Sequence, residues 1–297
     1  MKKLLLLLLL TASFSTFANS RLDFSLSDFC YKMPKVQDRG GIYYLPNEDV
    51  GITASSLCIY EDQYGQYASK VELVNGKFNG QLTEWHENGQ IESERNYKDG
   101  KEDGKWTMWH ENGQIDLEAT YKNGKLDGKR ISWYENGQIA DEGTYKNGKR
   151  DDGVFTIWFK NGQISYEETL KNGEYDGKRI SWYKNGGRSY EINYKDGKQH
   201  GKETDWYENG RRRSEINYKD GKQHGKDTYW YENGKKSSEV NFKDGTFDGK
   251  WTYWYENGQK LEEGDNKDDW REGKWTYWTE DGTVYLVEFY ENGALVK

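Results

Sequence analysis

A tryptophan recurs along this chain at a fixed interval of 24 residues, with a single interval of 25. Nine tryptophans keep this period: Trp85, Trp109, Trp133, Trp158, Trp182, Trp206, Trp230, Trp254 and Trp278. A glycine stands five residues before each of them, and another stands four residues after it. Such a period is the signature of a repeat architecture, in which each unit packs mainly against its neighbours. The sequence therefore predicts an array of similar units.

Each unit has the pattern of a β-hairpin. Around Trp254, the stretch 250–255 is rich in β-forming aromatic residues and is followed by Asn257-Gly258. An Asn-Gly pair between two such stretches is a strong hairpin signal, and in a two-residue type I′ turn both residues have positive φ. A second turn, Lys243-Asp244-Gly245, ends the second strand of the preceding unit. Helix is excluded because a glycine or a turn interrupts the chain every few residues.

A two-residue Asn-Gly turn also predicts which side chains share a face. The first face should carry the residue after the tryptophan (Tyr183, Tyr207, Tyr231, Tyr255), the residue at +6 counted from the tryptophan (Ile91, Ile115, Ile139, Ile164) and the tyrosine at +12 (Tyr97, Tyr121, Tyr145, Tyr194, Tyr218). The opposite face should carry the tryptophans, a threonine at −2 and a glutamate at +9. Glutamates in file would repel one another on a buried face, so we expect this face to be partly hydrated, with lysines and arginines nearby.

The tryptophan face is the candidate interaction face. Its proposed residues are Trp133, Trp158, Trp182, Trp206, Trp230, Trp254, Glu142, Glu167, Glu191, Glu215 and Glu239. One interpretation is structural: large rings shield the backbone and the threonines of a sheet that has no second layer. The other is a ligand surface, on which tryptophan beside glutamate stacks on sugars or holds choline-like cations.

The expected fold is all-β: an elongated, solenoid-like, single-layer antiparallel ribbon of stacked 24-residue β-hairpins. Residues 81–297 form the nine hairpin repeats, and a weaker match upstream makes residues 42–80 a degenerate first repeat. Residues 19–41 are expected to be an N-terminal cap, because terminal repeats have a neighbour on one side only.

Residues 1–18 have the pattern of a secretory signal peptide. Lys2-Lys3 precede a run of seven leucines, and the small residue Ala18 marks the expected cleavage site, with Ser20 as the alternative. The apolar run is too short to span a bilayer, and no later segment is apolar enough. The protein is therefore expected to be exported to the periplasm, the cell surface or the medium, with no integral membrane segment after cleavage. In an exported chain, Cys30 and Cys58 are expected to form a disulfide, with two free thiols as the alternative.

Charge and composition exclude several classes of function. The net charge is −8, and loss of Lys2 and Lys3 makes it −8 − 2 = −10, which disfavours nucleic acid as a partner. Equivalent histidines in adjacent units (His86 and His110, His200 and His224) would lie about 10 Å apart, too far to share a metal easily. The same local chemistry recurs in every unit, whereas an enzyme needs one asymmetric constellation. No catalytic, metal or cofactor site is therefore predicted, and the chain is not expected to be an enzyme.

The stretch Gly-Lys-Trp-Thr-Tyr-Trp-Tyr-Glu-Asn-Gly-Gln-Lys at 249–260 resembles the MORN-repeat variant family, whose bacterial members are often labelled YwqK-type antitoxin components. The resemblance covers about residues 42–297 and implies a solenoid-like ribbon of hairpins with a protein-interaction role.

Three functions follow as hypotheses. The first is an exported, non-enzymatic scaffold that binds a protein, a cell-envelope component or a host surface. The second, implied by the resemblance, is an antitoxin or immunity protein. The third is a glycan- or cell-wall-binding module. The sequence leaves the partner's identity and the oligomeric state open.

Overall fold

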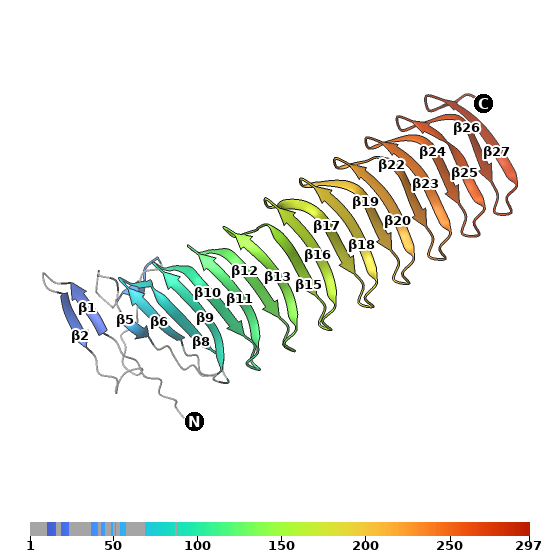
Figure 1. Cartoon of the computed structure of the whole chain (residues 1–297). Helices are drawn as coiled ribbons and strands as arrows, with labels where there is room; N and C mark the ends of the chain where they lie inside the picture. Colours follow the sequence, from blue (N-terminus) through green and yellow to red (C-terminus); the bar gives the residue numbers. More distant parts are fainter. Residues whose placement is uncertain are drawn as a thin grey trace. The chain divides into compact units, whose positions relative to one another are not determined.

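The computed structural model describes residues 11–15, 19–23, 37–40, 43–44, 49, 51, 54–57, 69–86, 88 and 90–297. It comprises two compact units, Met1–Arg150 and Asp151–Lys297, hereafter unit 1 and unit 2. All regular secondary structure in these described residues is β-strand. Within each unit the strands lie side by side in one layer, with turns at both edges (Figure 1). The predicted all-β, single-layer arrangement of antiparallel hairpins is confirmed.

Unit 1 contains two short separate hairpins and one longer antiparallel sheet. β1 pairs with β2 and β3 with β4, while the strands from β5 onward form the sheet. The strands are β1 (Thr11–Ser15), β2 (Asn19–Asp23), β3 (Gln37–Asp38), β4 (Tyr43–Tyr44), β5 (Ala54–Leu57), β6 (Ser69–Val74), β7 (Lys77–Phe78), β8 (Gly80–Trp85), β9 (Ile91–Lys98), β10 (Lys101–Trp109), β11 (Ile115–Lys122), β12 (Lys125–Trp133), β13 (Ile139–Lys146) and β14 (Lys149–Arg150).

Unit 2 is one antiparallel sheet in which strands adjacent in the chain are adjacent in space. Its strands are β15 (Gly153–Trp158), β16 (Ile164–Lys171), β17 (Glu174–Trp182), β18 (Arg188–Lys195), β19 (Lys198–Trp206), β20 (Arg212–Lys219), β21 (Lys222–Gln223), β22 (Gly225–Trp230), β23 (Lys236–Lys243), β24 (Thr246–Trp254), β25 (Lys260–Lys267), β26 (Trp270–Trp278), β27 (Val284–Glu291) and β28 (Ala294–Leu295).

The two sheet edges use different turns. At one edge, Asp244 and Gly245 have φ of 52° and 96°, and Lys243 pairs with Thr246 across them. This is the two-residue turn with two positive φ values, as in type I′. The same conformation recurs at the Asn-Gly and Asp-Gly pairs that follow the +12 residue in other repeats, for example Asn123-Gly124.

The turn after the tryptophan differs from the sequence-based expectation, which assigned positive φ to both Asn257 and Gly258. Only Gly258 has a positive φ, of 90°. The N–H of Gly258 donates to the carbonyl of Tyr255 at 2.8 Å, and the N–H of Tyr255 donates to the carbonyl of Gln259 at 2.9 Å. The loop thus has three residues, a turn followed by a left-handed glycine. The Asn257 side chain explains the difference: its Oδ1 accepts the N–H of Gln259, and its Nδ2 donates to the carbonyl of Glu280 in the next hairpin.

This turn changes two of the predicted face assignments. Trp254 itself pairs with the +6 residue, Lys260, so the +6 column lies on the tryptophan face and not opposite the tyrosine that follows the tryptophan. The prediction for Ile91, Ile115, Ile139 and Ile164 was therefore wrong. The tyrosines that follow the tryptophan lie in the turn, where Tyr183, Tyr207, Tyr231 and Tyr255 donate to the carbonyl of the next tryptophan.

A β-bulge next to each tryptophan restores the predicted register farther along the strands. Thr252 pairs with Glu263, and the register shift falls between Tyr253 and Trp254. Directly opposed residues of an antiparallel pair project to the same face, so the threonine and glutamate columns share a face with the tryptophans. That part of the prediction is confirmed.

Most of the buried side chains lie on the other face, which we call the Tyr face. It carries positions −3, −1, +8, +10 and +12, and its most buried side chains include Ile192 at 1%, Trp275 at 1% and Val240 at 4% exposure. Within the described residues the sheet has a single layer, and side chains on this face pack against those of adjacent hairpins, as Trp251 does against Trp275. The core is thus a continuous row along one side of a sheet.

Several sequence-based assignments concern the N-terminal region. β1 lies within the predicted signal peptide, and β2 begins at Asn19, directly after the predicted cleavage position. Cys30 and Cys58, together with residues 1–10 and 16–18, lie outside the described residues. The cap, 19–41, and the degenerate repeat, 42–80, include further residues outside the description.

Candidate interaction face

The tryptophans of the repeat are half-buried in both units, Trp133 in unit 1 and Trp158, Trp182, Trp206, Trp230 and Trp254 in unit 2. The threonines two positions earlier are covered: Thr228 is 6% exposed and Thr252 is 3% exposed. Tryptophan and threonine alternate on one strand and so project to the same side. This geometry agrees with a shielding role for the rings, and it leaves part of each ring accessible.

Each glutamate at +9 is paired with a lysine at −4 of its own hairpin wherever that lysine occurs. In unit 1, Lys129 Nζ lies 2.6 Å from Glu142 Oε1. In unit 2, Lys178 pairs with Glu191 at 2.7 Å and Lys226 with Glu239 at 3.1 Å. In the hairpin of Glu167, position −4 is Val154 and not lysine, and Glu167 is half-buried. Thus the glutamate column, predicted to be screened by neighbouring cations, is bridged to the adjacent strand.

Cations also lie over the tryptophan rings. Lys236 Nζ is 5.9 Å from the centre of the Trp254 ring, and Lys260 Nζ is 5.5 Å from that of Trp278. Such contacts between a cation and an indole face stabilise both groups by about 0.5–1 kcal/mol at exposed sites. Tryptophan, lysine and glutamate therefore form one connected surface along successive hairpins, which we call the Trp face.

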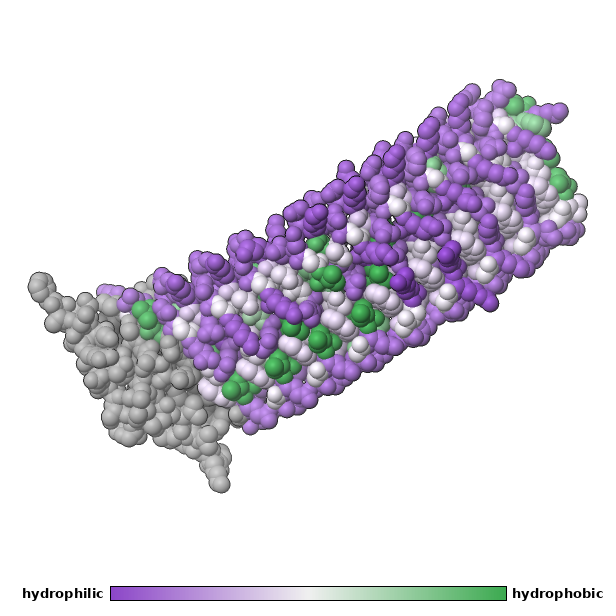
Figure 2. All heavy atoms as spheres, viewed as in Figure 1, coloured by the Kyte–Doolittle hydropathy of each residue, from purple (hydrophilic) through white to green (hydrophobic). Residues whose placement is uncertain are grey.

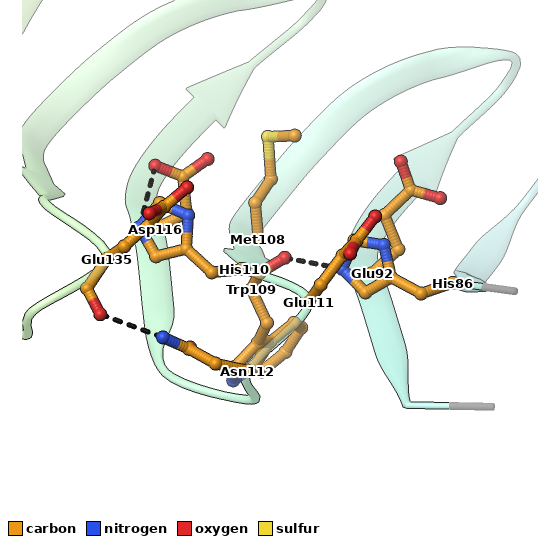
Figure 3. A pocket seen from close by; sticks show the side chains of 9 residues that line it. All are labelled: His86, Glu92, Met108, Trp109, His110, Glu111, Asn112, Asp116 and Glu135. Atoms are coloured by element: carbon orange, nitrogen blue, oxygen red, sulfur yellow. Dashed lines mark hydrogen bonds and ion pairs between the residues drawn. The ribbon is translucent and has the colours of Figure 1, made fainter. Parts of the chain in front are cut away.

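A pocket of about 500 Å³ lies at the turn edge of unit 1 (Figure 3). His86 and His110 occupy the position that is tyrosine in most later hairpins, and they make the same contact. His86 Nε2 is 2.7 Å from the carbonyl oxygen of Trp109, and His110 Nε2 is 3.0 Å from that of Trp133. Asp116 Oδ1 lies 3.5 Å from His110 Nε2. The two histidines therefore act as substitutes for the tyrosine hydroxyl in the turn.

The Tyr face holds buried carboxylates that the sequence reasoning missed. Asp227 is 0% exposed; its Oδ1 accepts the N–H of Asn217 at 2.7 Å and its Oδ2 accepts Gln223 Nε2 at 3.2 Å. Burial, together with the charge of Glu203, raises the pKa of Asp227 to about 6, against the lowering effect of the Asn217 hydrogen bond. Glu168 is 1% exposed and accepts a hydrogen bond from the Tyr166 hydroxyl.

These carboxylates sit at positions whose residue changes from hairpin to hairpin. Position −3, for example, is leucine, tryptophan, arginine, phenylalanine, glutamate or aspartate. Variation of this kind in a repeat resembles that of a solvated surface, so the sequence carried no signal that residues at position −3, such as Asp227 and Trp275, are buried.

Among the described residues, no group of three or more histidine, cysteine, aspartate and glutamate side chains is arranged to hold a metal ion. The described part of the chain also contains no helix with the length and apolarity needed to cross a membrane.

Comparison with known proteins identifies the repeat. The family model described as "MORN repeat variant" matches eight consecutive segments: 78–99, 102–123, 126–147, 151–172, 175–196, 199–220, 223–244 and 247–266. No significant match to a curated protein was found. Among solved structures, a chain of the "Crystal Structure of TcdB2-TccC3" aligns with 81% of this chain and 16% of its own length, at 9% identity and a TM-score of 0.17. That likeness is too low to support any statement about function.

Proposed function

Because this chain belongs to the MORN repeat variant family, we propose that it is an exported, non-enzymatic scaffold that binds a protein or a cell-envelope component through its Trp face. The observation that carries the proposal is the recurrence of one surface: a half-buried tryptophan, a covered threonine and a bridged glutamate return in successive hairpins. Equivalent sites on the sheet of one unit are linked, so binding at one site raises the effective concentration of the partner at the next, and several weak contacts give a higher affinity.

Export is supported by the N-terminal sequence, with its two lysines, its leucine run and Ala18. It is tested by N-terminal sequencing of the protein recovered from the envelope or the medium, which should begin near Asn19. Full-length protein confined to the cytoplasm would contradict this part of the proposal.

Binding is tested by affinity capture from the native envelope with the full mature chain. A variant with Trp206→Ala, Trp230→Ala and Trp254→Ala serves as the comparison, after its melting curve shows that it remains folded. Loss of the captured component with this variant supports the Trp face as the contact. Equal capture by both chains would exclude it.

An antitoxin or immunity role is the second candidate, and the family resemblance is what favours it. It predicts a stoichiometric complex with a toxin whose gene lies beside that of this protein. For an exported chain the toxin would have to act outside the cytoplasm. Co-expression with the neighbouring gene product, scored by growth rescue, separates this role from a general scaffold.

A further inference from the structure

Four consecutive hairpins of unit 2 carry a second cation on the Trp face, at position +6. Arg188, Arg212, Lys236 and Lys260 stand there, and each lies beside the glutamate three residues later in its own strand. Arg212 is 3.0 Å from Glu215, Lys236 is 2.6 Å from Glu239, and Lys260 is 2.7 Å from Glu263. Each of these glutamates therefore lies between two cations, one at −4 and one at +6. We call this row the cation ladder: Lys178, Arg188, Lys202, Arg212, Lys226, Lys236, Lys250 and Lys260.

The cations of the ladder are more exposed than the glutamates they contact. The side chain of Arg212 is 59% exposed and that of Lys202 is 51% exposed, whereas that of Glu215 is 20% exposed. The same order holds for Lys226 at 55% against Glu239 at 21%. One carboxylate neutralises one of the two cations, so the hairpins of Glu191, Glu215 and Glu239 each present an excess of one positive charge outward. In the fourth hairpin, Asp265 lies opposite Lys250 and balances the second cation. This excess is notable in a chain with a net charge of −8.

The cations favour the ionised form of two of these glutamates, Glu239 and Glu263. Partial burial acts to raise the pKa of Glu239, but hydrogen bonds from Lys236 and Lys226 and their positive charge outweigh it and lower the pKa. Glu263 is lowered in the same way by Lys260 and Lys250. These two carboxylates are therefore charged partners of their lysines at neutral pH.

The fold itself does not require a cation at +6. In four earlier hairpins the residue at this position is Ile91, Ile115, Ile139 or Ile164, and it pairs with the tryptophan in the same register. Isoleucine at +6 forms the same β-bulge and pairs with the tryptophan in the same way. The basic residues of the later hairpins are therefore not needed for the fold, and what they add is positive charge on the surface. Figure 2 shows that the visible face of the molecule is largely hydrophilic, with apolar residues in isolated spots.

The spacing of these positive charges limits which class of anionic polymer can bind. Neighbouring strands lie about 4.8 Å apart, so one excess cation recurs about every 10 Å across the first three hairpins of the ladder. Double-stranded DNA carries a charge about every 1.7 Å and binds through dense neutralisation of its phosphates, which this sparse row on an acidic protein does not supply. A polymer with widely spaced anionic groups fits better. Indole rings beside the cations offer the flat apolar surface on which sugar rings pack.

We propose that the cation ladder of unit 2 binds an acidic polysaccharide, with the basic side chains at +6 contacting its carboxylates and the tryptophan rings contacting its sugars. The proposal rests on the proposed function, since it names the chemistry of an envelope or surface partner for the Trp face. The polymer should lie across successive hairpins, so that each hairpin contributes one ionic contact and the contacts act together.

Hyaluronan, which has a carboxylate on every second sugar, is the probe, and hyaluronan with its carboxylates amidated is the neutral comparison. Binding of the full mature chain is measured by calorimetry. An exposed ion pair changes affinity by about twofold. The quadruple variant Arg188→Gln, Arg212→Gln, Lys236→Gln, Lys260→Gln should therefore bind roughly tenfold more weakly or worse. The amidated polymer should not bind, and an ionic strength near 1 M, where the Debye length is about 3 Å, should weaken binding strongly.

The chain offers a matched control. Lys195, Lys219, Lys243 and Lys267 are exposed lysines at the turns of the same four hairpins. These lysines lie on the same face as the ladder but at its turn edge, outside the set of cations that contact the glutamates. Replacing all four with glutamine removes the same charge and should change the affinity by less than about threefold by the same reasoning. If both quadruple variants weaken binding equally, the effect is one of net charge and the ladder is not the site.

A third variant tests the opposite direction. Replacing Glu191, Glu215, Glu239 and Glu263 with glutamine frees the second cation of each pair and should strengthen hyaluronan binding severalfold. Weaker binding by this variant, with an unchanged melting temperature, would overturn the proposal. If the quadruple ladder variant does not fold, the double variants Arg188→Gln/Arg212→Gln and Lys236→Gln/Lys260→Gln provide the same measurement.

Two further results distinguish this proposal from the general function. If the chain captures an envelope protein but binds neither hyaluronan nor another carboxylated polysaccharide, the glycan proposal is wrong and the scaffold function stands. If the polysaccharide binds in a way that depends on the cation ladder, and no protein is captured, the glycan proposal is supported and the binding of a protein partner is not. Preferential binding to DNA or to anionic lipid vesicles would overturn it.

Discussion

The hydroxyl of Tyr207 donates a hydrogen bond to the carbonyl of Trp230, 23 residues later and 2.7 Å away. The same bond links Tyr183 to Trp206 at 2.6 Å and Tyr231 to Trp254 at 2.6 Å. Each bond joins the turn of one hairpin to the end of a strand in the next. Together with the asparagine that bridges the same two turns, for example Asn209 to the carbonyl of Glu232, it forms a row of contacts along one sheet edge.

Replacing Tyr207 with phenylalanine should remove this bond and keep the ring. We expect a loss of about 1 kcal/mol in the free energy of unfolding, since the carbonyl of Trp230 loses a partner at a partly hydrated edge. Chemical denaturation followed by tryptophan fluorescence measures the change. Phe159 occupies the equivalent position naturally, so the ring alone is compatible with the turn. Tyr285→Phe, at a side chain 59% exposed, is the control and should have no effect.

Gly264 is needed because Trp275 occupies the space beside it. A Cβ at Gly264 would lie 2.2 Å from Cδ2 of Trp275, and the Trp275 side chain is only 1% exposed. Gly264→Ala should therefore destabilise unit 2 by about 1–3 kcal/mol through overpacking. Trp275→Leu should relieve the clash, so the double variant should lose less than the two single changes added together. A double-mutant cycle by denaturation checks this, and simple additivity would show that the two side chains do not compete for space.

Asp227 makes stability depend on pH. Its pKa rises from 3.8 to about 6 on folding because burial, followed by the charge of Glu203, disfavours the carboxylate. The folded state then binds a proton more tightly than the unfolded state, so the free energy of unfolding falls as pH rises from about 4 to about 6, and it stays lower above that. Asp227→Asn should raise stability at pH 7.5 by about 1–2 kcal/mol and by little at pH 4.

Thermal or denaturant unfolding across this pH range measures the effect of the Asp227 substitution. Asp265→Asn removes an exposed carboxylate of the same sheet and serves as the control. If both variants show the same pH profile as the unsubstituted chain, ionisation of Asp227 does not couple to folding.

The sequence predicted the parts of the fold that depend on the period, and it missed the parts that depend on the next hairpin. The period and the turn residues were sufficient for an all-β array and for the pairing of Thr252 with Glu263. The conformation of the turn at Asn257 was missed because its side chain bonds to Glu280, in the following unit. The position of Tyr207 was missed for the same reason.

Burial was the second property that the sequence did not reveal. The invariant tryptophans are half-buried, whereas the variable position −3 includes Asp227 at 0% and Trp275 at 1% exposure. In a single sheet, a small residue in one hairpin can leave room for a large side chain in the next, as Gly264 does for Trp275. A buried position can therefore hold different residues in different hairpins. The cation ladder was likewise not predicted, because the +6 residue was assigned to the wrong face.

The candidate roles of the tryptophans make different predictions for Trp206→Ala. If the ring mainly shields Thr204 and the backbone, the melting temperature should fall, by up to the equivalent of about 3 kcal/mol for a half-buried ring, while affinity for a captured partner is retained. If the ring is a contact for the partner, affinity should fall with a small change in melting. We expect the melting shift to be the larger effect, because Thr204 is only 9% exposed. Both quantities are measured on the same purified variant.

The modular sheet predicts that length changes are tolerated only in whole hairpins. Deleting Gly177–His200, which is 24 residues, joins Asp176 to Gly201 and keeps the direction of every later strand. The shortened chain should fold with a cooperative melt, since each hairpin contacts mainly its neighbours.

Deleting Gly177–Arg188 instead, which is 12 residues, removes one strand and its turn. Every later strand would then have to reverse its direction to stay antiparallel, and its polar and buried faces would exchange. This chain should expose unpaired strand edges and aggregate. Size-exclusion chromatography and circular dichroism compare the two deletions. If both yield folded, soluble chains, then the hairpin is not the cooperative unit of this protein.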